Sequence, residues 1–253
     1  MRTRRKLSAG WLLSLYLAGC ATVPYTNRHQ FNIISEDKES QLGLEAYADV
    51  KKKNKLSHDP EINAQVERVG RRIAKAADMP EYHWEFTVID DPKTVNAFCL
   101  PGGKIAVYTG ILPLTKDDNG LAVVLGHEVS HALAHHGAER MSQQEVVGFG
   151  ETIASVAGLA TPAGMQAFDM AYGVGLGLPH SRKQESEADH IGLILMAKAG
   201  YDPHHAVEFW SRMAREMQGK APPAFLSDHP SDTNRIEKIK EELPEALRYY
   251  HPT

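Results

Sequence analysis

The sequence predicts an α+β fold that is mainly helical and carries one small β-sheet. From Leu121 onward, apolar side chains recur at helical spacing along most of the chain. Two short runs rich in aromatic and β-branched residues, 84–89 and 105–108, are typical of strands. The 253 residues are 42% hydrophobic and 24% charged, which is ordinary for a globular protein and excludes a disordered or fibrous chain.

Two helices are expected before the sheet. Ser35 has the character of an N-cap and is followed by an acidic first turn, so a helix begins there and continues to about Val50. A second helix is expected over Pro60–Ala77, where apolar residues again recur at helical spacing. We interpret both helices as scaffold.

The two strands are separated by turn residues, and helices follow them. The second strand begins after the turn Pro101-Gly102-Gly103. The helices expected after the sheet are Leu121–Gly137, Gln143–Leu159, Arg182–Lys198, Pro203–Met217 and Asp232–Leu243. Residues 161–179 are rich in Gly and Ala, and we expect them to form either a mobile lid or a loosely packed helix.

The N-terminus has the pattern of a secretory signal peptide. Four basic side chains within residues 2–6 precede an apolar run that is about half the ~20 residues needed to cross a bilayer. The run ends in Leu-Ala-Gly-Cys20, which resembles a bacterial lipobox and implies cleavage before Cys20 and acylation of its thiol. We therefore expect residues 1–19 to be a signal peptide and residues 20–34 to be a lipidated tether. The alternative is an uncleaved anchor with a chance cysteine.

The residue after the cysteine indicates the destination. Ala21 stands where an inner-membrane retention signal usually has aspartate. By this resemblance, the mature chain is anchored on the periplasmic side of the outer membrane of a Gram-negative bacterium. The membrane partner is then reached through the lipid on Cys20.

Charge and cysteine content exclude two further classes of protein. The net charge is −4, and it becomes −8 once the four basic residues of 1–19 are removed, so nucleic acid is not an expected partner. Only Cys20 and Cys99 are present. With Cys20 acylated, Cys99 has no partner, and no intrachain disulfide is expected.

The strongest chemical signal is the motif His127-Glu128-Val129-Ser130-His131 in an apolar helical stretch. On a helix, His127 and His131 project from one face about 6 Å apart and can bind one ion, for which Zn²⁺ is well suited. Glu128 lies on the neighbouring side, where it can accept a proton from a zinc-bound water as that water attacks a carbonyl. The alternative, a buried polar cluster without metal, would be costly.

A catalytic zinc site needs a third protein ligand. The candidates are Glu185, Glu187 and Asp189 on a second predicted helix. Glu185 and Asp189 share a face at i and i+4, whereas Glu187 lies about 200° around the helix from Glu185. This spacing favours Glu185 as a ligand, with Asp189 orienting a ligating histidine. A solvated acidic face is the alternative.

Four blocks of the sequence together resemble one zinc metallopeptidase family of the gluzincin type. They are His127-Glu128-x-x-His131, Glu185-x-x-x-Asp189, Asn96 to Gly103, and His229-Pro230-x-x-x-x-Arg235. The family includes HtpX, the CAAX prenyl protease, and the periplasmic lipoproteins LoiP and BepA. The resemblance implies a zincin-like fold, one Zn²⁺ per chain, and a single metallopeptidase domain over 35–253 with Glu185 as third ligand. The build is closest to LoiP, because we expect neither a tetratricopeptide array nor membrane-spanning helices.

The resemblance also implies roles for residues around the metal. The Pro-Gly-Gly turn leads into an edge strand, taken as 104–109, on which an extended peptide pairs through its backbone. The substrate-binding residues implied are Asn96, Gly102, Gly103, Lys104, Ile105, Ala106 and Val107. His229 either closes the site as a fourth ligand or stabilises the oxyanion, and Arg235 supports the site.

Cys99 has two possible interpretations, and several histidines have no assigned role. Cys99 either ligates metal or is a small buried hydrophobic residue, which is the more usual state of a free cysteine. The histidines with no assigned chemistry include His135, His136, His180, His190, His204 and His205. Whether His229 or residues 161–179 close the resting site stays open, as does the oligomeric state.

The favoured function is a zinc endopeptidase whose substrates are unfolded or misassembled envelope proteins. Glu128, His229 and Asp189 are its expected catalytic residues, and His127, His131 and Glu185 its metal ligands. The rival is a latent or non-proteolytic assembly factor or chaperone in which His229 caps the zinc. A purely structural zinc site is disfavoured because such sites are usually rich in cysteine.

Overall fold

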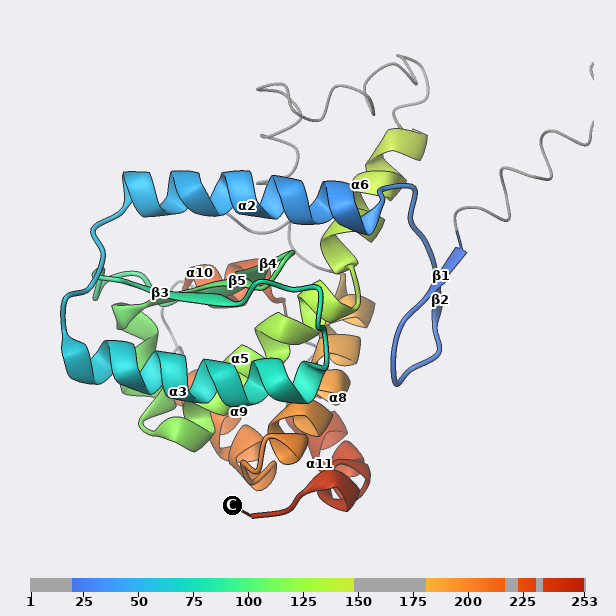
Figure 1. Ribbon diagram of the computed structural model, residues 1–253. Helices are drawn as coiled ribbons and strands as arrows, with labels where there is room; N and C mark the ends of the chain where they lie inside the picture. Colours follow the sequence, from blue (N-terminus) through green and yellow to red (C-terminus); the bar gives the residue numbers. More distant parts are fainter. Residues whose placement is uncertain (1–19, 148–180, 217–222, 231–233, 253) are drawn as a thin grey trace, which may run out of the picture.

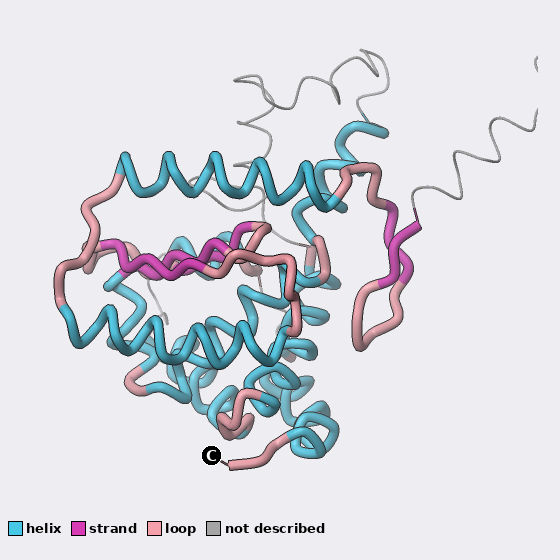
Figure 2. The backbone as a smooth tube through the Cα atoms, viewed as in Figure 1, coloured by secondary structure: helices cyan, strands magenta, loops and turns pink. Residues whose placement is uncertain are grey.

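The computed structural model describes residues 20–147, 181–216, 223–230 and 234–252. A small sheet lies between helix α2 (Glu36–Lys53) on one face and helices α3 (Pro60–Ala77) and α5 (Asp118–Leu133) on the other (Figure 1). Helices α8 (Arg182–Lys198), α9 (His204–Glu216) and α11 (Arg235–Ala246) pack beyond α5, so most of the described chain is helical (Figure 2). The fold is therefore α+β and mainly helical, as the sequence predicts.

The first two long helices begin at side-chain caps. Helix α2 spans Glu36–Lys53 and starts where the Ser35 hydroxyl accepts a hydrogen bond from the Lys38 N–H. Helix α3 spans Pro60–Ala77, with Asp59 capping two N–H groups of its first turn and proline at its first position. Both helices lie where the sequence predicts them.

The sheet has three strands, of which the sequence predicts two. These are β3 (Glu85–Ile89), β4 (Ala97–Leu100) and β5 (Lys104–Tyr108), in the order β3-β5-β4. β5 pairs in parallel with β3 and antiparallel with β4, so it is the central strand. The assignment of 104–109 as the edge strand is therefore wrong. The edge on the side of α5 is β4, which the sequence did not reveal because all four of its residues are buried and show no alternation.

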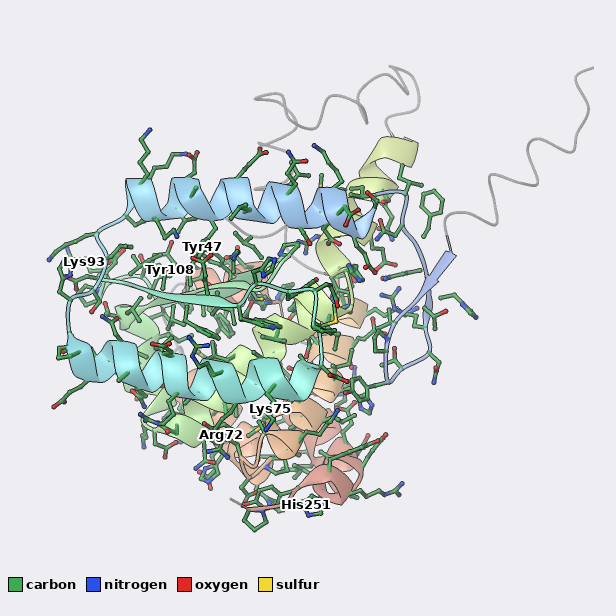
Figure 3. The ribbon with its side chains drawn as sticks, in the orientation of Figure 1. Tyr47, Arg72, Lys75, Lys93, Tyr108 and His251 are labelled. Carbon is green, nitrogen blue, oxygen red and sulfur yellow. The ribbon has the colours of Figure 1, made fainter. Side chains whose placement is uncertain are left out.

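Alternate residues of the sheet pack against different helices. Phe98, Leu100 and Ala106 belong to a cluster that includes the buried face of α2. Cys99 and Ile105 point the other way and join the main core with α3 and α5. Tyr47 reaches from α2 to the sheet and hydrogen-bonds the Thr87 hydroxyl (Figure 3). The helix that carries the motif is thus fixed against one face of the sheet.

Helix α5 (Asp118–Leu133) is the centre of the molecule, and it is buried from Gly120 onward. It packs most closely on α8 (Arg182–Lys198). A Cβ atom at Gly192 would lie 3.0 Å from the His127 nitrogen, and one at Gly126 would lie 2.9 Å from the Gly192 oxygen. Glycine at both positions lets the two backbones touch, which brings the acidic residues of α8 to the histidines of α5.

The motif helix ends earlier than its periodicity predicts. α5 stops at Leu133, and His135 adopts the left-handed conformation with φ 51° before α6 (His136–Val147) begins. The side chain of His135 turns away from the motif and hydrogen-bonds Glu39 of α2. The rest of the predicted helix Gln143–Leu159, and all of 161–179, lie outside the described residues.

The remaining helices complete the shell around α5 and α8. They are α4 (Leu112–Thr115), α9 (His204–Glu216), α10 (Ala224–Asp228) and α11 (Arg235–Ala246), with 3-10 turns at Thr109–Ile111 and Leu247–Tyr249. α8, α9 and α11 correspond to predicted helices, whereas α4 and the short α10 were not predicted. No helix among the described residues is long and apolar enough to span a membrane.

Residues 20–34 are not a free tether in this structure. β1 (Cys20–Thr22) and β2 (His29–Phe31) form an antiparallel hairpin, shown at the right of Figure 1. Val23 is 1% exposed and joins the main core. Arg28 of the hairpin forms ion pairs with two buried acids, Glu139 of α6 and Glu187 of α8. The predicted signal peptide, 1–19, lies outside the described residues.

Candidate metal centre

Four buried side chains place one ligand atom each within 4.8 Å of one another. They are His127, His131, Glu185 and His229. Among the described residues, this is the group of histidine, cysteine and acidic side chains that could hold a metal ion. It combines two helices and a loop, because His127 and His131 come from α5, Glu185 from α8, and His229 directly follows α10.

The histidines of α5 point their Nε2 atoms at the same place. The Nε2 atoms of His127 and His131 are 3.1 Å apart. Glu185 approaches both, with carboxylate oxygens 3.3 Å from His127 Nε2 and 3.4 Å from His131 Nε2. The i,i+4 spacing within the motif therefore does what its helical geometry predicts.

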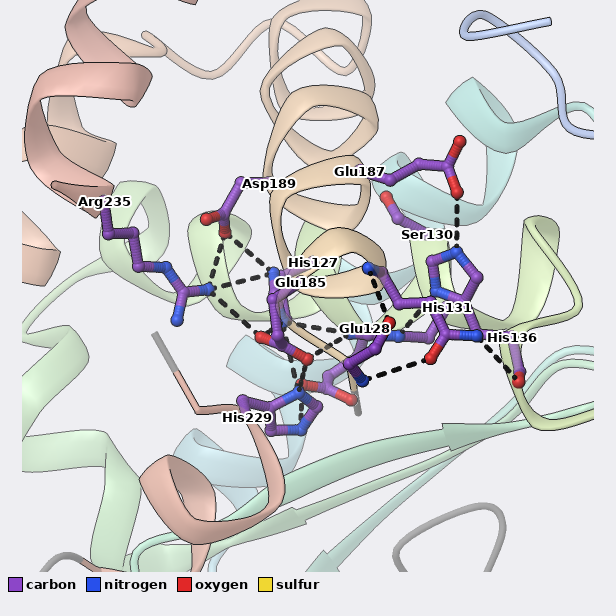
Figure 4. Close-up of polar contacts among 12 residues, drawn as sticks. His127, Glu128, Ser130, His131, His136, Glu185, Glu187, Asp189, His229 and Arg235 are labelled. Carbon is purple, nitrogen blue, oxygen red and sulfur yellow. Dashed lines mark hydrogen bonds and ion pairs between the residues drawn. The ribbon is translucent and has the colours of Figure 1, made fainter. Parts of the chain in front are cut away.

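Asp189 and Arg235 lie on one side of this cluster (Figure 4). The Nδ1 atom of His127 is 2.9 Å from Asp189 Oδ1. Arg235 donates to the same carboxylate oxygen over 2.6 Å, and its guanidinium lies 3.3 Å from the centroid of the Trp210 ring. Arg235 thus fixes Asp189, which in turn fixes the ring of His127.

His136 and Glu187 lie on the opposite side (Figure 4). The Nδ1 atoms of His131 and His136 are 2.9 Å apart, and His136 Nε2 is 3.0 Å from Glu187 Oε2. Sequence reasoning assigned no chemistry to His136. The contact between His131 and His136 depends on the helix break at His135, which the sequence does not reveal. The one sequence signal for this contact is a further histidine five residues after the motif.

The arrangement of protons in these contacts fits a cation. Asp189 is an acceptor, so Nδ1 of His127 carries the proton and its Nε2 presents a lone pair. Two such Nε2 atoms and a carboxylate facing one another would repel without a positive charge between them. Although burial lowers the pKa of His127, Glu185 and Asp189 raise it above its ordinary value, which shows how strongly the site attracts positive charge. Imidazole and carboxylate ligands are those of zinc sites.

The surroundings of Glu185 and Asp189 on α8 favour their ionised forms. Burial opposes ionisation of Glu185, but His229 and His127 hold the pKa of its carboxyl well below the usual value. Burial likewise opposes ionisation of Asp189, while Arg235 and His127 hold its pKa low. Both side chains therefore act as anions toward the histidines.

Glu128 is the acid of the cluster that burial keeps neutral. Burial raises the pKa of its carboxyl to about 8, against an opposing effect of His229. Its Oε1 atom lies 3.4 Å from His229 Nε2, and it is not part of the donor group. A positive charge bound by the donor group would lower this pKa and leave a carboxylate ready to accept a proton.

His229 joins the donor group rather than standing apart from it. Its Nδ1 atom is 3.0 Å from Glu185 Oε1 and 3.3 Å from His127 Nε2. This position places His229 among the four side chains that could hold a metal ion. The other candidate cover, residues 161–179, lies outside the described residues.

The central strand β5 is not available to a peptide. The predicted substrate residues Ile105, Ala106 and Val107 are fully buried. Both edges of β5 already pair with other strands, β3 on one side and β4 on the other. The Nζ atom of the buried Lys104 binds Glu85 Oε1 over 2.6 Å and the His83 carbonyl. These four residues support the sheet instead of contacting a substrate.

Three further residues predicted to bind substrate also have structural partners. Gly102 and Gly103 have positive φ values and form the turn between β4 and β5, where a Cβ at Gly103 would meet the Trp84 ring at 2.9 Å. Asn96 is buried, caps the Ala97 N–H through its side-chain oxygen, and donates to Asp228. Asn96 therefore links the edge strand to the helix that precedes His229.

The backbone of β4 has an outward-facing side. Asn96 exchanges a backbone hydrogen bond with Tyr108, so residues 96, 98 and 100 face β5 and the odd-numbered residues face away. The Val95 carbonyl on that side accepts from the Phe225 N–H of α10. Among the described contacts, no backbone hydrogen bond involves Cys99 on this side. This edge therefore begins next to α10, the helix that precedes His229.

The two cysteines have different surroundings. Cys99 is 3% exposed, its thiol is directed at the Leu100 carbonyl, and burial raises its pKa well above the usual value. It lies outside the donor group and packs as a small apolar residue. Cys20 is the first described residue and pairs with Phe31 in the hairpin.

Comparison with known proteins gives consistent matches over most of the chain. Peptidase family M48 matches residues 60–243. The mitochondrial metalloendopeptidase OMA1 of Schizosaccharomyces pombe is 41% identical over 93% of this chain and 72% of its own length. OMA1 of Saccharomyces cerevisiae is 33% identical over 94% and 75%. The beta-barrel assembly-enhancing protease of Yersinia pestis is 25% identical over 87% of this chain and 46% of its own length.

Proposed function

The chain belongs to peptidase family M48 and is a metalloendopeptidase, and we propose that it works with one zinc ion in the bacterial envelope. The observation that carries the choice of metal is the donor group of three imidazoles and one carboxylate. Two of these imidazoles are held by partners on their far nitrogens, His127 by Asp189 and His131 by His136. Such outer partners fix the tautomer that a zinc ligand needs.

Glu128 is the proposed general base. A zinc ion held by His127, His131 and Glu185, with His229 withdrawn, would have a position for a water, would lower the pKa of that water toward about 7 and would polarise the scissile carbonyl. Glu128 then accepts the proton of the attacking water and passes it to the leaving amine. Its burial in an apolar helix keeps the carboxylate poorly solvated and its pKa high, which suits a group that must both accept and release a proton.

The proposed substrate is an extended peptide lying along β4. Its backbone would pair with the outward-facing groups of Cys99 and its neighbours, within reach of the donor group. Only an unfolded segment exposes a backbone edge in this way. We therefore infer that the substrates are unfolded or misassembled proteins of the envelope. The name of the Yersinia relative, a beta-barrel assembly-enhancing protease, supports this substrate class.

The proposed location is the periplasmic side of the outer membrane, with the chain anchored through a lipid on Cys20. The support is the basic and apolar pattern of residues 2–17 followed by Leu-Ala-Gly-Cys20. Mass spectrometry of Cys20 in membrane-extracted protein tests this part. An unmodified Cys20 preceded by an intact residue 19 would contradict it.

The first prediction tests the peptidase mechanism with unfolded casein as substrate. We expect the purified protein to cleave casein, and Glu128→Gln to reduce kcat by at least about 100-fold, because general-base catalysis contributes ~10²–10⁴-fold. Zinc content should stay unchanged in Glu128→Gln, since this side chain is outside the donor group. Equal cleavage by both proteins would refute the mechanism.

A second candidate function rests on the position of His229. His229 lies within the donor group, and there it would occupy the fourth position on the metal, as expected for a latent enzyme or a non-proteolytic assembly factor. The second prediction is that His229→Ala raises the basal rate of casein cleavage while zinc stays bound by three ligands. A loss of cleavage with zinc still bound would instead assign His229 to oxyanion stabilisation. Absence of cleavage by the wild-type protein and by His229→Ala would favour the non-proteolytic function.

A further inference from the structure

A chain of buried polar contacts connects the N-terminal hairpin to the metal centre. The hairpin comprises residues 20–31, and its Arg28 donates from Nε to Glu187 Oε2 over 2.7 Å. Thr26 of the same hairpin donates to Glu187 Oε1. Glu187 Oε2 also contacts His136 Nε2 at 3.0 Å, and His136 Nδ1 lies 2.9 Å from His131 Nδ1. His131 belongs to the donor group.

Each contact in this chain fixes the next. An ionised Glu187 only accepts, so His136 must carry its proton on Nε2 and present a lone pair at Nδ1. The Nδ1 atom of His131 must then carry a proton and donate it to His136. The Nε2 atom of His131 is consequently left with the lone pair that a metal ion requires.

The environment makes this arrangement rigid. The side chains of Arg28, Glu187 and His136 are 14%, 5% and 0% exposed, respectively. Arg28 also forms a two-pronged pair with Glu139 of α6, over 2.6 and 3.0 Å. Arg28 therefore bridges Glu139 of α6 and Glu187 of α8, and so joins the hairpin to both helices.

We propose that the N-terminal hairpin is an integral part of the metal centre, in which Arg28 and Thr26 position the His131 ligand through Glu187 and His136. This inference rests on the proposed zinc site and adds positioning residues to it. His131 differs from His127, because the Nδ1 atom of His127 contacts a carboxylate, that of Asp189, directly. The carboxylate that serves His131 acts through a second imidazole, and the hairpin sets the position of that carboxylate.

The test measures metal binding instead of peptidase activity. Zinc affinity is determined by competition with a chromophoric chelator, and the visible spectrum of bound Co²⁺ reports the ligand geometry. The variants are His136→Leu, His136→Asn, Arg28→Met and Thr26→Val. Arg68→Met is the matched control, because Arg68 makes a similar two-pronged pair with Asp118 on α5. Both side chains of this pair are more exposed than those of Arg28 and Glu139.

We expect His136→Leu to weaken zinc binding by about 10–100-fold and Arg28→Met by about tenfold, the range seen when outer partners of metal ligands are removed. His136→Asn should recover much of the loss, because its side-chain oxygen can accept from His131 Nδ1. Thr26→Val should weaken binding less, and Arg68→Met should leave it unchanged. The Co²⁺ spectrum should change in His136→Leu and Arg28→Met only.

Two results would overturn the proposal. One is wild-type affinity and an unchanged Co²⁺ spectrum in Arg28→Met, or in Thr26→Val where Arg28→Met does not fold. The other is equal affinity of His136→Leu and His136→Asn. Zinc binding by a wild-type protein that fails to cleave casein would refute the peptidase function and leave this proposal standing. A wild-type protein that does not bind zinc would refute both.

Discussion

At the scale of single residues, the charge of each side chain in this protein depends on its partners more than on its type. Glu128 and Glu185 are both buried glutamates within one cluster, yet the pKa of Glu128 is raised to about 8 and that of Glu185 is held well below its usual value. The difference is that His229 and His127 face the carboxylate of Glu185 closely. In the proposed mechanism, these two states suit Glu185 to hold the metal and Glu128 to carry a proton.

The third prediction concerns a histidine away from the cluster. Glu242 of α11 raises the pKa of His190 above its ordinary value, with Glu245 adding to the effect. A raised pKa in the folded state means that the pair stabilises the fold below about pH 6.5 and that this contribution disappears as the pH rises through the folded-state pKa. His190→Gln should therefore lower the free energy of unfolding by about 0.5 kcal/mol at acidic pH and not at alkaline pH.

Urea unfolding at two pH values checks this prediction. Glu242→Gln is the control, because it removes the same pair from the other side and should give the same pH dependence. A loss of stability in His190→Gln that is larger at alkaline pH would show that packing, and not the ion pair, is the contribution of His190.

At the scale of elements, the site depends on how closely α5 and α8 approach. Gly126 and Gly192 are in contact across the two helices, and this sets the distance between the histidines and the acids. A longer side chain at either position would separate the two halves of the donor group. Sequence patterns could place both helices, but neither glycine had a signal that distinguished it from an ordinary helix glycine.

The fourth prediction follows from this contact. In Gly192→Ala, the new methyl group lies 3.0 Å from the backbone nitrogen of His127, so the helices must move apart. We expect the free energy of unfolding to fall by about 1–3 kcal/mol, as for other overpacked cores, and zinc affinity to fall as well. Ser186→Ala on the same helix is the control and should change neither. Unchanged zinc affinity in a folded Gly192→Ala protein would contradict the dependence on helix spacing.

At the scale of the whole molecule, local patterns predicted the parts and long-range contacts decided the arrangement. The helices 60–77 and 182–198 have the predicted bounds, and helix 36–53 begins at the predicted cap but extends three residues beyond the predicted end at Val50. These elements were predictable because caps and periodicity are local signals. The order of the strands in the sheet was not predictable, since β3 pairs with β5 although β4 lies between them in the sequence. The docking of the hairpin was missed because the acids that bind Arg28 lie more than 100 residues away.

The last prediction concerns the metal and the stability of the fold as a whole. The donor group comes from α5, α8 and the residue after α10. An ion bound there would therefore cross-link three parts of the chain that are far apart in the sequence. Because zinc binds the folded state, it should stabilise the protein by about 4 kcal/mol at a free concentration ~1,000 times its Kd. Chelation should therefore lower the melting temperature, and added Zn²⁺ should restore it. Mg²⁺ serves as the control, because it prefers oxygen ligands and should have no effect. A melting temperature that is the same with and without zinc would mean that the cluster does not bind this ion in the folded protein.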